Sequence, residues 1–204
     1  MEQLVKLGVV VDVDAVALGE FEIVAIRAGE ANGLTYTPAV LGRGARLFNG
    51  LTVFCNHPSA LDMSRPGGRR IEDIAGVVTS AWFDARSESV RAVLSAGGPK
   101  GELVAGLAGQ IVADRDAGLA VPNVGLSADM YVRVGKDGKT VEEIRRVLSL
   151  DVVFNPAAGG SFERVLNAVQ ELASMACAVQ DGASVACQDG HASMACALQE
   201  GGRF

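Results

Sequence analysis

Short apolar runs separated by turn-forming residues constrain the fold of this chain more than any other feature. The runs are rich in β-branched and aromatic residues, which favour strands, and they cover residues 21–26, 51–56, 74–83, 89–94, 130–134 and 141–154. Asn49-Gly50 and the Gly-Lys-Asp-Gly segment 135–138 are typical hairpin or tight-turn sequences, and a hairpin turn is predicted over 136–139. No strict alternation of strands and helices is present, so the pattern predicts a mainly antiparallel sheet.

Two segments before the last run predict helices. Residues 39–47 follow Thr37, a good N-cap, and Pro38, which is tolerated in the first turn. Residues 99–118 carry apolar side chains at spacings of three and four, as an amphipathic helix requires.

A third helix is predicted over 161–175, with Ser161 as its cap and Glu163 and Arg164 on its outer face. Residues 29–33 are expected to form a turn, and the polar segment 59–70 a long loop. The expected fold class is therefore α+β, with a mainly antiparallel, barrel-like β core flanked by a few helices.

The end of the chain differs in kind, because one short unit occurs there three times. The copies begin at Ala173, Ala183 and Ala192, and each contains one cysteine, at Cys177, Cys187 and Cys196. Short repeats rich in Ala, Gly and Gln are typical of a mobile or weakly helical extension. The sequence predicts one domain over 1–172 and a repeat tail over 173–204.

Charge and cysteine usage exclude several classes of function. The chain has 204 residues and a net charge of −6, which argues against a general nucleic-acid binder. It has no uninterrupted apolar stretch of about 18 residues, and the first 20 residues lack the basic start of a secretion signal, so they are interpreted as strand or core. Four cysteines without a Cys-x-x-Cys pair predict neither a zinc site nor a disulfide framework, and they fit a reducing cytoplasm.

The stretch 121–130, VPNVGLSADM, contains the candidate nucleophile Ser127. Gly125, two residues earlier, permits a close backbone approach. A serine hydroxyl needs a base to become nucleophilic. Of the two histidines, His191 lies in the repeat tail, which leaves His57, at the end of a strong strand, as the only credible base.

The base in turn needs a group that holds its tautomer. Asp151 begins an apolar strand segment, where a carboxylate needs a specific reason to be, although it could also merely cap or turn the chain. Glu142 and Glu143 are rivals for this role. A Cys55–His57 dyad is a further alternative.

Several short motifs occur in an order and spacing that resemble a known family. They are Asn56-His57-Pro58, Ile74-Ala75-Gly76-Val77, Trp82-Phe83-Asp84, Gly125-Leu126-Ser127, Leu150-Asp151-Val152-Val153 and Asn155-Pro156-Ala157-Ala158-Gly159-Gly160. Together they resemble the prohead (capsid maturation) proteases of tailed bacteriophages, which are similar in turn to the herpesvirus assemblin proteases. The resemblance covers about residues 20–170.

This resemblance implies a serine endopeptidase without metal or cofactor. Ser127 would be the nucleophile, His57 the general base and then acid, and Asp151 the orienting carboxylate. Gly159 and Gly160 are candidates for the oxyanion hole, because glycine permits the backbone geometry needed, although they equally fit a plain connecting loop.

The implied substrates are capsid and scaffold proteins, cut inside assembling proheads in the host cytoplasm. Self-cleavage within the tail and self-association are further expectations, and nucleic acid and membrane are not expected partners. A scaffold-like role for the tail stays open. The alternatives are a non-catalytic capsid-assembly or scaffolding module and a serine hydrolase of small esters. Arg65, Arg69 and Arg70 are expected to form a solvated loop face or to contact an acidic scaffold substrate.

Overall fold

A computed structural model describes residues 18–64 and 68–168. The strand or core expected at the N-terminus falls largely within residues 1–17, which lie outside the described residues. The predicted domain boundary at 172 and the repeat tail 173–204 also lie outside them.

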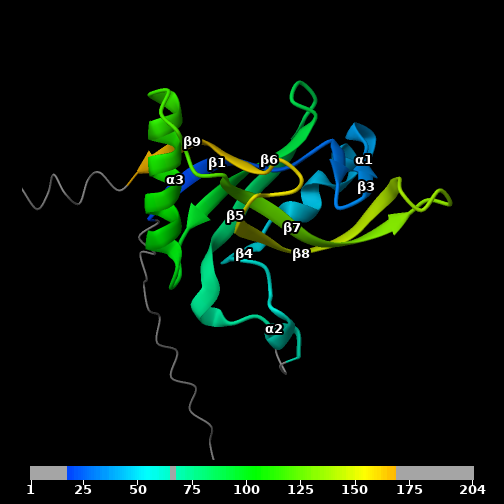
Figure 1. The fold of residues 1–204 in the computed structure, drawn as a ribbon, viewed down its shortest axis with the longest axis horizontal. Helices are drawn as coiled ribbons and strands as arrows, with labels where there is room; N and C mark the ends of the chain where they lie inside the picture. The colour runs from blue at the N-terminus through cyan, green and yellow to red at the C-terminus, as the bar shows by residue number, and fades with distance from the viewer. Residues whose placement is uncertain (1–17, 65–67, 169–204) are drawn as a thin grey trace, which may run out of the picture. The chain divides into compact units, whose positions relative to one another are not determined.

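Seven strands form one mixed sheet in the order β7-β8-β4-β5-β6-β1-β9 (Figure 1). Their bounds are β1 Gly19–Arg27, β4 Thr52–Cys55, β5 Ile74–Asp84, β6 Ser89–Ala96, β7 Val124–Val134, β8 Val141–Phe154 and β9 Ser161–Ala168. Neighbouring strands are antiparallel except β4 and β8, which are parallel. A separate two-stranded hairpin consists of β2 (Gly29–Ala31) and β3 (Leu34–Tyr36).

The predicted α+β class with a mostly antiparallel core is confirmed. The strand order has two ends, β7 and β9, and within the described residues these two strands share no hydrogen-bonded register. The sheet is therefore not a closed barrel.

Two of the predicted helices are present. Helix α1 (Pro38–Gly44) begins where expected, and the Thr37 hydroxyl accepts a hydrogen bond from the Val40 N–H at 3.3 Å. A 3₁₀ helix, η1 (Ala45–Phe48), continues it.

Helix α3 (Gly101–Asp116) lies beside β9 (Figure 1). Its buried residues include Val104, Ala108, Ile111 and Val112. These positions fit the spacing of three and four that predicted the helix.

The third predicted helix is wrong within the described residues. Residues 161–168 form strand β9, which pairs with β1 through antiparallel hydrogen bonds, and residues 169–175 are not described. The Phe162 side chain is buried and meets the Phe21 ring edge to face, with 6.4 Å between ring centroids. A free edge of β1 and this aromatic contact outweigh the local helical pattern.

Two predicted connections contain regular structure. The expected turn over 29–33 begins with strand β2, so the turn itself is confined to Asn32-Gly33. The expected loop over 59–70 contains helix α2 (Ala60–Ser64), and a short 3₁₀ helix, η2 (Ile71–Asp73), follows it.

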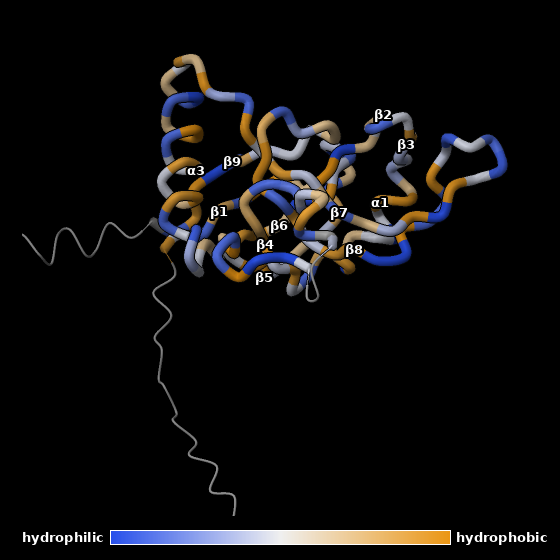
Figure 2. Tube along the Cα trace, turned by 60° about the horizontal axis from the view of Figure 1, so that its bottom comes forward, coloured by the Kyte–Doolittle hydropathy of each residue, from blue (hydrophilic) through white to orange (hydrophobic). Residues whose placement is uncertain are grey.

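The β7–β8 hairpin extends beyond the rest of the sheet. Its tip, which includes the predicted turn residues 136–139, is hydrophilic (Figure 2). Near the tip, strand β8 has a buried residue at every third position, Val141, Ile144 and Val147, and it is buried throughout from Ser149 to Val153. The hairpin is therefore solvated at its tip and part of the core at its base.

Two glycines bring the backbones at the ends of the sheet order together. A Cβ atom added to Gly125 at the start of β7 would lie 2.0 Å from the Gly160 carbonyl oxygen. A Cβ atom added to Gly160 would lie 2.0 Å from the Leu126 carbonyl oxygen. Only glycine permits this backbone contact at either position.

Candidate active site

Strand β8 places Asp151 between β7, which carries Ser127, and β4, which ends two residues before His57. Phe54 on β4 is its partner in the parallel ladder, and Ser127 on β7 is its partner in the antiparallel ladder. Directly paired residues project from the same face of a sheet. The candidate nucleophile and the candidate carboxylate therefore share one face of neighbouring strands.

Asn56 ends β4 and turns the chain toward β8. Its N–H donates to the Val152 carbonyl at 2.8 Å, and its φ of 63° is in the left-handed region that asparagine tolerates. The next residue, His57, lies with its Nδ1 2.7 Å from the Asp151 Oδ2. If Nδ1 carries the proton in this contact, Nε2 is the basic nitrogen of the ring.

The Asp151 carboxyl group is fully buried and has three partners. Arg69 donates from Nη1 to Oδ2 at 3.1 Å, and the Ser149 hydroxyl donates to Oδ1 at 2.9 Å. A buried carboxylate is stable only when it is paired and hydrogen-bonded. These partners, together with His57, meet that requirement and fix the orientation of the carboxyl group.

Arg69 is not part of a solvated loop face. Its second guanidinium nitrogen donates to the Asn56 carbonyl at 2.8 Å, and the guanidinium lies 4.1 Å from the centroid of the Phe54 ring. Arg70 is half exposed and pairs with Glu72 at 3.6 Å, and Arg65 lies outside the described residues. The expectation of a solvated face is therefore wrong for Arg69, because its positively charged guanidinium pairs with the buried Asp151 carboxylate.

Two cavities adjoin the candidate nucleophile and base. One has a volume of about 360 Å³ and is also lined by Pro58, Ala128 and Asp129. The other has a volume of about 240 Å³ and is also lined by residues 153–157. Three residues, Asn32, His57 and Ser127, line both cavities.

Across residues 18–64 and 68–168, no hydrogen bond joins the Ser127 hydroxyl to the His57 ring. Catalytic hydrogen bonds of this kind are often long in the absence of substrate and tighten when it binds. Ser127 and His57 are brought to the same cavities, and His57 and Asp151 are in direct contact.

Gly159 and Gly160 are not among the residues that line these two cavities. Gly159 has a φ of 65°, and its carbonyl accepts a hydrogen bond from the Arg27 Nε at 3.3 Å. Gly160 packs on the Leu126 backbone and lines a different cavity, of about 260 Å³. The structure thus shows packing contacts for both glycines, and their oxyanion role stays a prediction.

The rivals for the acid role lie elsewhere on β8. Glu142 and Glu143 both pair with Arg133, at 2.6 Å and 3.1 Å, toward the tip of the β7–β8 hairpin. Asp151 is the carboxylate in contact with His57.

Cys55 shows no sign of an activated thiol. Burial raises the pKa of the Cys55 thiol, and the neighbouring Lys100 only partly offsets this effect. A nucleophilic cysteine needs a lowered pKa. Cys55 is also absent from the residues that line the two cavities beside His57.

Comparison with known proteins gives no relative: the chain matches no protein-family model, no curated protein and no solved structure. In the described part of the chain, no group of three or more His, Cys, Asp or Glu side chains is arranged to hold a metal ion. No helix among the described residues is long and apolar enough to cross a membrane.

Sequence reasoning missed three residues of this region. Ser149 is two positions before Asp151, so strand periodicity places both side chains on one face and could have found it. Arg69 reaches Asp151 from a loop, which carries no such periodic signal. Asn32 lies on a hairpin far from Ser127 in sequence, and nothing local indicates that it lines the same cavities.

Proposed function

We propose that this protein is a serine endopeptidase of the prohead-maturation type. In this proposal Ser127 is the nucleophile, His57 the general base and then acid, and Asp151 the carboxylate that orients the imidazole. The observation that carries the proposal is the 2.7 Å contact between His57 Nδ1 and Asp151 Oδ2, beside cavities that Ser127 also lines.

The fold is compatible with this proposal. The resemblance implies a barrel-like β core, and the contact between the Gly125 and Gly160 backbones brings the two ends of the strand order together at one point. We therefore propose that the sheet is a strongly curved, incompletely closed relative of such a core.

The chemistry is acyl transfer. The Ser127 Oγ attacks the carbonyl carbon of a peptide bond while His57 accepts the hydroxyl proton. Collapse of the tetrahedral intermediate breaks the C–N bond, and His57 returns the proton to the leaving amine. Water then repeats the sequence on the acyl-enzyme and restores Ser127.

The proposed substrates are capsid and scaffold proteins inside assembling proheads in the host cytoplasm, together with the tail of the protein itself. Ala-Ser dipeptides at 173–174, 183–184 and 192–193 offer small residues for self-cleavage. Intact-mass analysis after incubation tests this part separately, since an active enzyme that does not shorten would contradict it.

The central experiment is co-expression with the cognate capsid and scaffold proteins, read by intact mass. Wild-type protein is compared with Ser127→Ala and with Ser80→Ala, a matched control because Ser80 is an exposed serine in strand β5. We expect cleaved products with wild type and the control, and uncleaved precursors with Ser127→Ala.

Identical products from wild type and Ser127→Ala would show that Ser127 is structural and would contradict the proposal. If wild type and both variants leave the precursors uncleaved while particles assemble normally, the non-catalytic assembly module is favoured instead.

A further inference from the structure

The two cavities beside Ser127 meet at three residues. Asn32, His57 and Ser127 line both of them, whereas each remaining lining residue borders only one. Under the proposed function, the reacting carbonyl group must lie next to the Ser127 hydroxyl, at this junction. Asn32 is the only one of the three without a role in the proposed mechanism.

A tight hairpin holds Asn32 in place. Ala31 pairs with Leu34, so the turn consists of Asn32 and Gly33 alone. Their φ angles of 52° and 76° are both left-handed, as the favoured two-residue hairpin turn requires. The Thr35 N–H donates to the Lys139 carbonyl at 2.9 Å, which ties this hairpin to the β7–β8 hairpin.

The turn accounts for an asparagine at position 32, but it does not account for its place at the junction of the cavities. In the described ranges, 18–64 and 68–168, the Asn32 carboxamide makes no hydrogen bond to another residue. Its NH₂ group is a neutral donor with two hydrogens. Asn32 therefore brings a donor without a hydrogen-bond partner among the described residues to the two cavities that Ser127 and His57 also line.

Acyl transfer requires such a donor. As the serine oxygen bonds to the carbonyl carbon, the C=O π electrons move onto oxygen, and that negative charge must be stabilised by nearby N–H groups. Gly159 and Gly160, the residues first considered for this task, do not line the cavities that contain Ser127. Asn32 does.

We propose that the Asn32 Nδ2–H₂ group donates a hydrogen bond to the carbonyl oxygen under attack and stabilises the oxyanion. This inference rests on the proposed function. It makes Asn32 a catalytic residue, because its amide touches the reacting oxygen.

Two variants separate the amide donor from the turn. Asn32→Gly keeps the left-handed backbone and removes the side chain, and Asn32→Asp keeps the shape and replaces the donor with an acceptor. Glu88→Gly is the matched control, because Glu88 also has a left-handed φ, of 49°, at the β5–β6 hairpin and does not line these cavities.

The full-length proteins are compared by the pre-steady-state burst with p-nitrophenyl acetate and by the rate of Ser127 labelling with a fluorophosphonate. We expect the acylation rate to fall on the order of 100-fold in both Asn32 variants, with little change in KM, because an oxyanion donor acts mainly in the transition state. Glu88→Gly should react at the wild-type rate. Thermal melting verifies that each variant is folded.

The outcomes are distinguishable. If wild type acylates Ser127 and both Asn32 variants react within twofold of it, the inference is overturned while the proposed function stands. If Glu88→Gly loses as much activity as Asn32→Gly, the loss reflects the hairpin backbone and the inference is again overturned. A wild-type protein that neither hydrolyses the ester nor is labelled would overturn both.

Discussion

The Asp151 carboxyl group connects three other side chains of the candidate site. It accepts from His57, Arg69 and Ser149, and it has no contact with solvent. Such a group fixes geometry as well as charge, because each partner approaches from a different segment of the chain. Its orientation is therefore determined by the fold itself.

The first prediction concerns Asp151→Asn. The amide keeps the shape but leaves Arg69 without its anionic partner and gives His57 the wrong hydrogen-bond pattern. We expect cleavage of co-expressed substrate to fall about 10³- to 10⁴-fold, and the free energy of unfolding to fall by about 1–3 kcal/mol. Quantitative mass spectrometry and denaturant unfolding measure the two effects.

Asp116→Asn is the control for this substitution, because the Asp116 side chain is 68% exposed and only pairs with Arg115 at 3.6 Å. It should change neither quantity appreciably. An Asp151→Asn protein with wild-type cleavage would contradict the orienting role.

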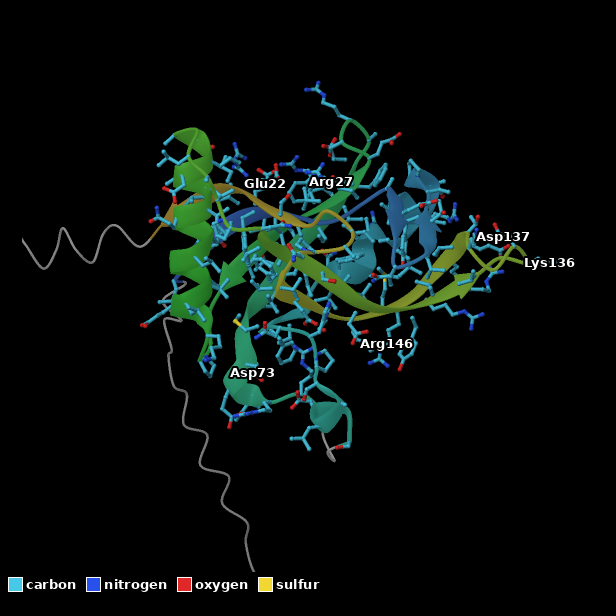
Figure 3. All side chains as sticks on the ribbon, viewed as in Figure 1. Glu22, Arg27, Asp73, Lys136, Asp137 and Arg146 are labelled. Carbon is cyan, nitrogen blue, oxygen red and sulfur yellow. The ribbon has the colours of Figure 1, made fainter. Side chains whose placement is uncertain are left out.

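At the scale of elements, the tip of the β7–β8 hairpin is stabilised by Asp137 (Figure 3). Hydrogen bonds from the Thr140 hydroxyl and from the Lys139 and Thr140 N–H groups lower the pKa of Asp137 to about 2. The folded value is below the unfolded value, so this stabilisation is fully present above about pH 4. It is lost as the pH falls through about 2.

We expect the Asp137 carboxyl carbon to titrate by NMR with a midpoint near 2, and the Lys139 and Thr140 amide shifts to follow the same curve. In Asp137→Asn those amide shifts should not change over that range. A wild-type midpoint near the ordinary aspartate value would contradict this account of the turn.

Strand β9 gives a second prediction at this scale. Phe162→Ala removes a buried ring that packs against Phe21, and we expect it to lower the free energy of unfolding by about 3–5 kcal/mol. Leu166→Ala on the same strand is the control, since the Leu166 side chain is 37% exposed. This substitution should lower the free energy of unfolding by less than about 1 kcal/mol. Equal effects of the two substitutions, measured by denaturant unfolding, would contradict the packing of β9.

Elements fixed by neighbouring residues could be predicted from the sequence, whereas elements fixed by distant partners could not. Local signals succeeded: Thr37 caps α1, and the turn over 136–139 joins β7 and β8. The 161–175 segment failed because the partner of β9 is β1, at the other end of the domain sequence, and no local pattern records that pairing.

The candidate site likewise contains residues that the local sequence indicates and one whose contacts depend on how distant segments fold together. Asp151 and His57 could be singled out from the sequence, because a carboxylate in an apolar run is conspicuous and a predicted strand ends at the histidine. Their contact is present, and their catalytic roles stay predictions. Arg69 was misjudged, because its partner is set by how a loop folds back over β4 and β8.

At the scale of the whole molecule, the two ends of the sheet order meet where Gly125 faces Gly160. Gly160→Ala would place a methyl group 2.0 Å from the Leu126 carbonyl oxygen, so backbone must move. We expect the free energy of unfolding to fall by about 1–3 kcal/mol. Gly106→Ala, in α3 with open space around it, should instead stabilise by up to about 1 kcal/mol.

Denaturant unfolding of the two alanine variants tests this contrast. A Gly160→Ala protein as stable as wild type would show that the backbones at this point can separate freely, and that the contact contributes little to the fold.

The parallel pairing of β4 with β8 also has a consequence for the order of events during synthesis. His57 is made early, but its partner Asp151 lies 94 residues later, on a strand that must insert between β4 and β7. A growing chain therefore carries Ser127 and His57 before it carries Asp151. Under the proposed function, no complete site can exist until strand β8 has been made and has paired with β4 and β7, which delays any cutting until that pairing has formed.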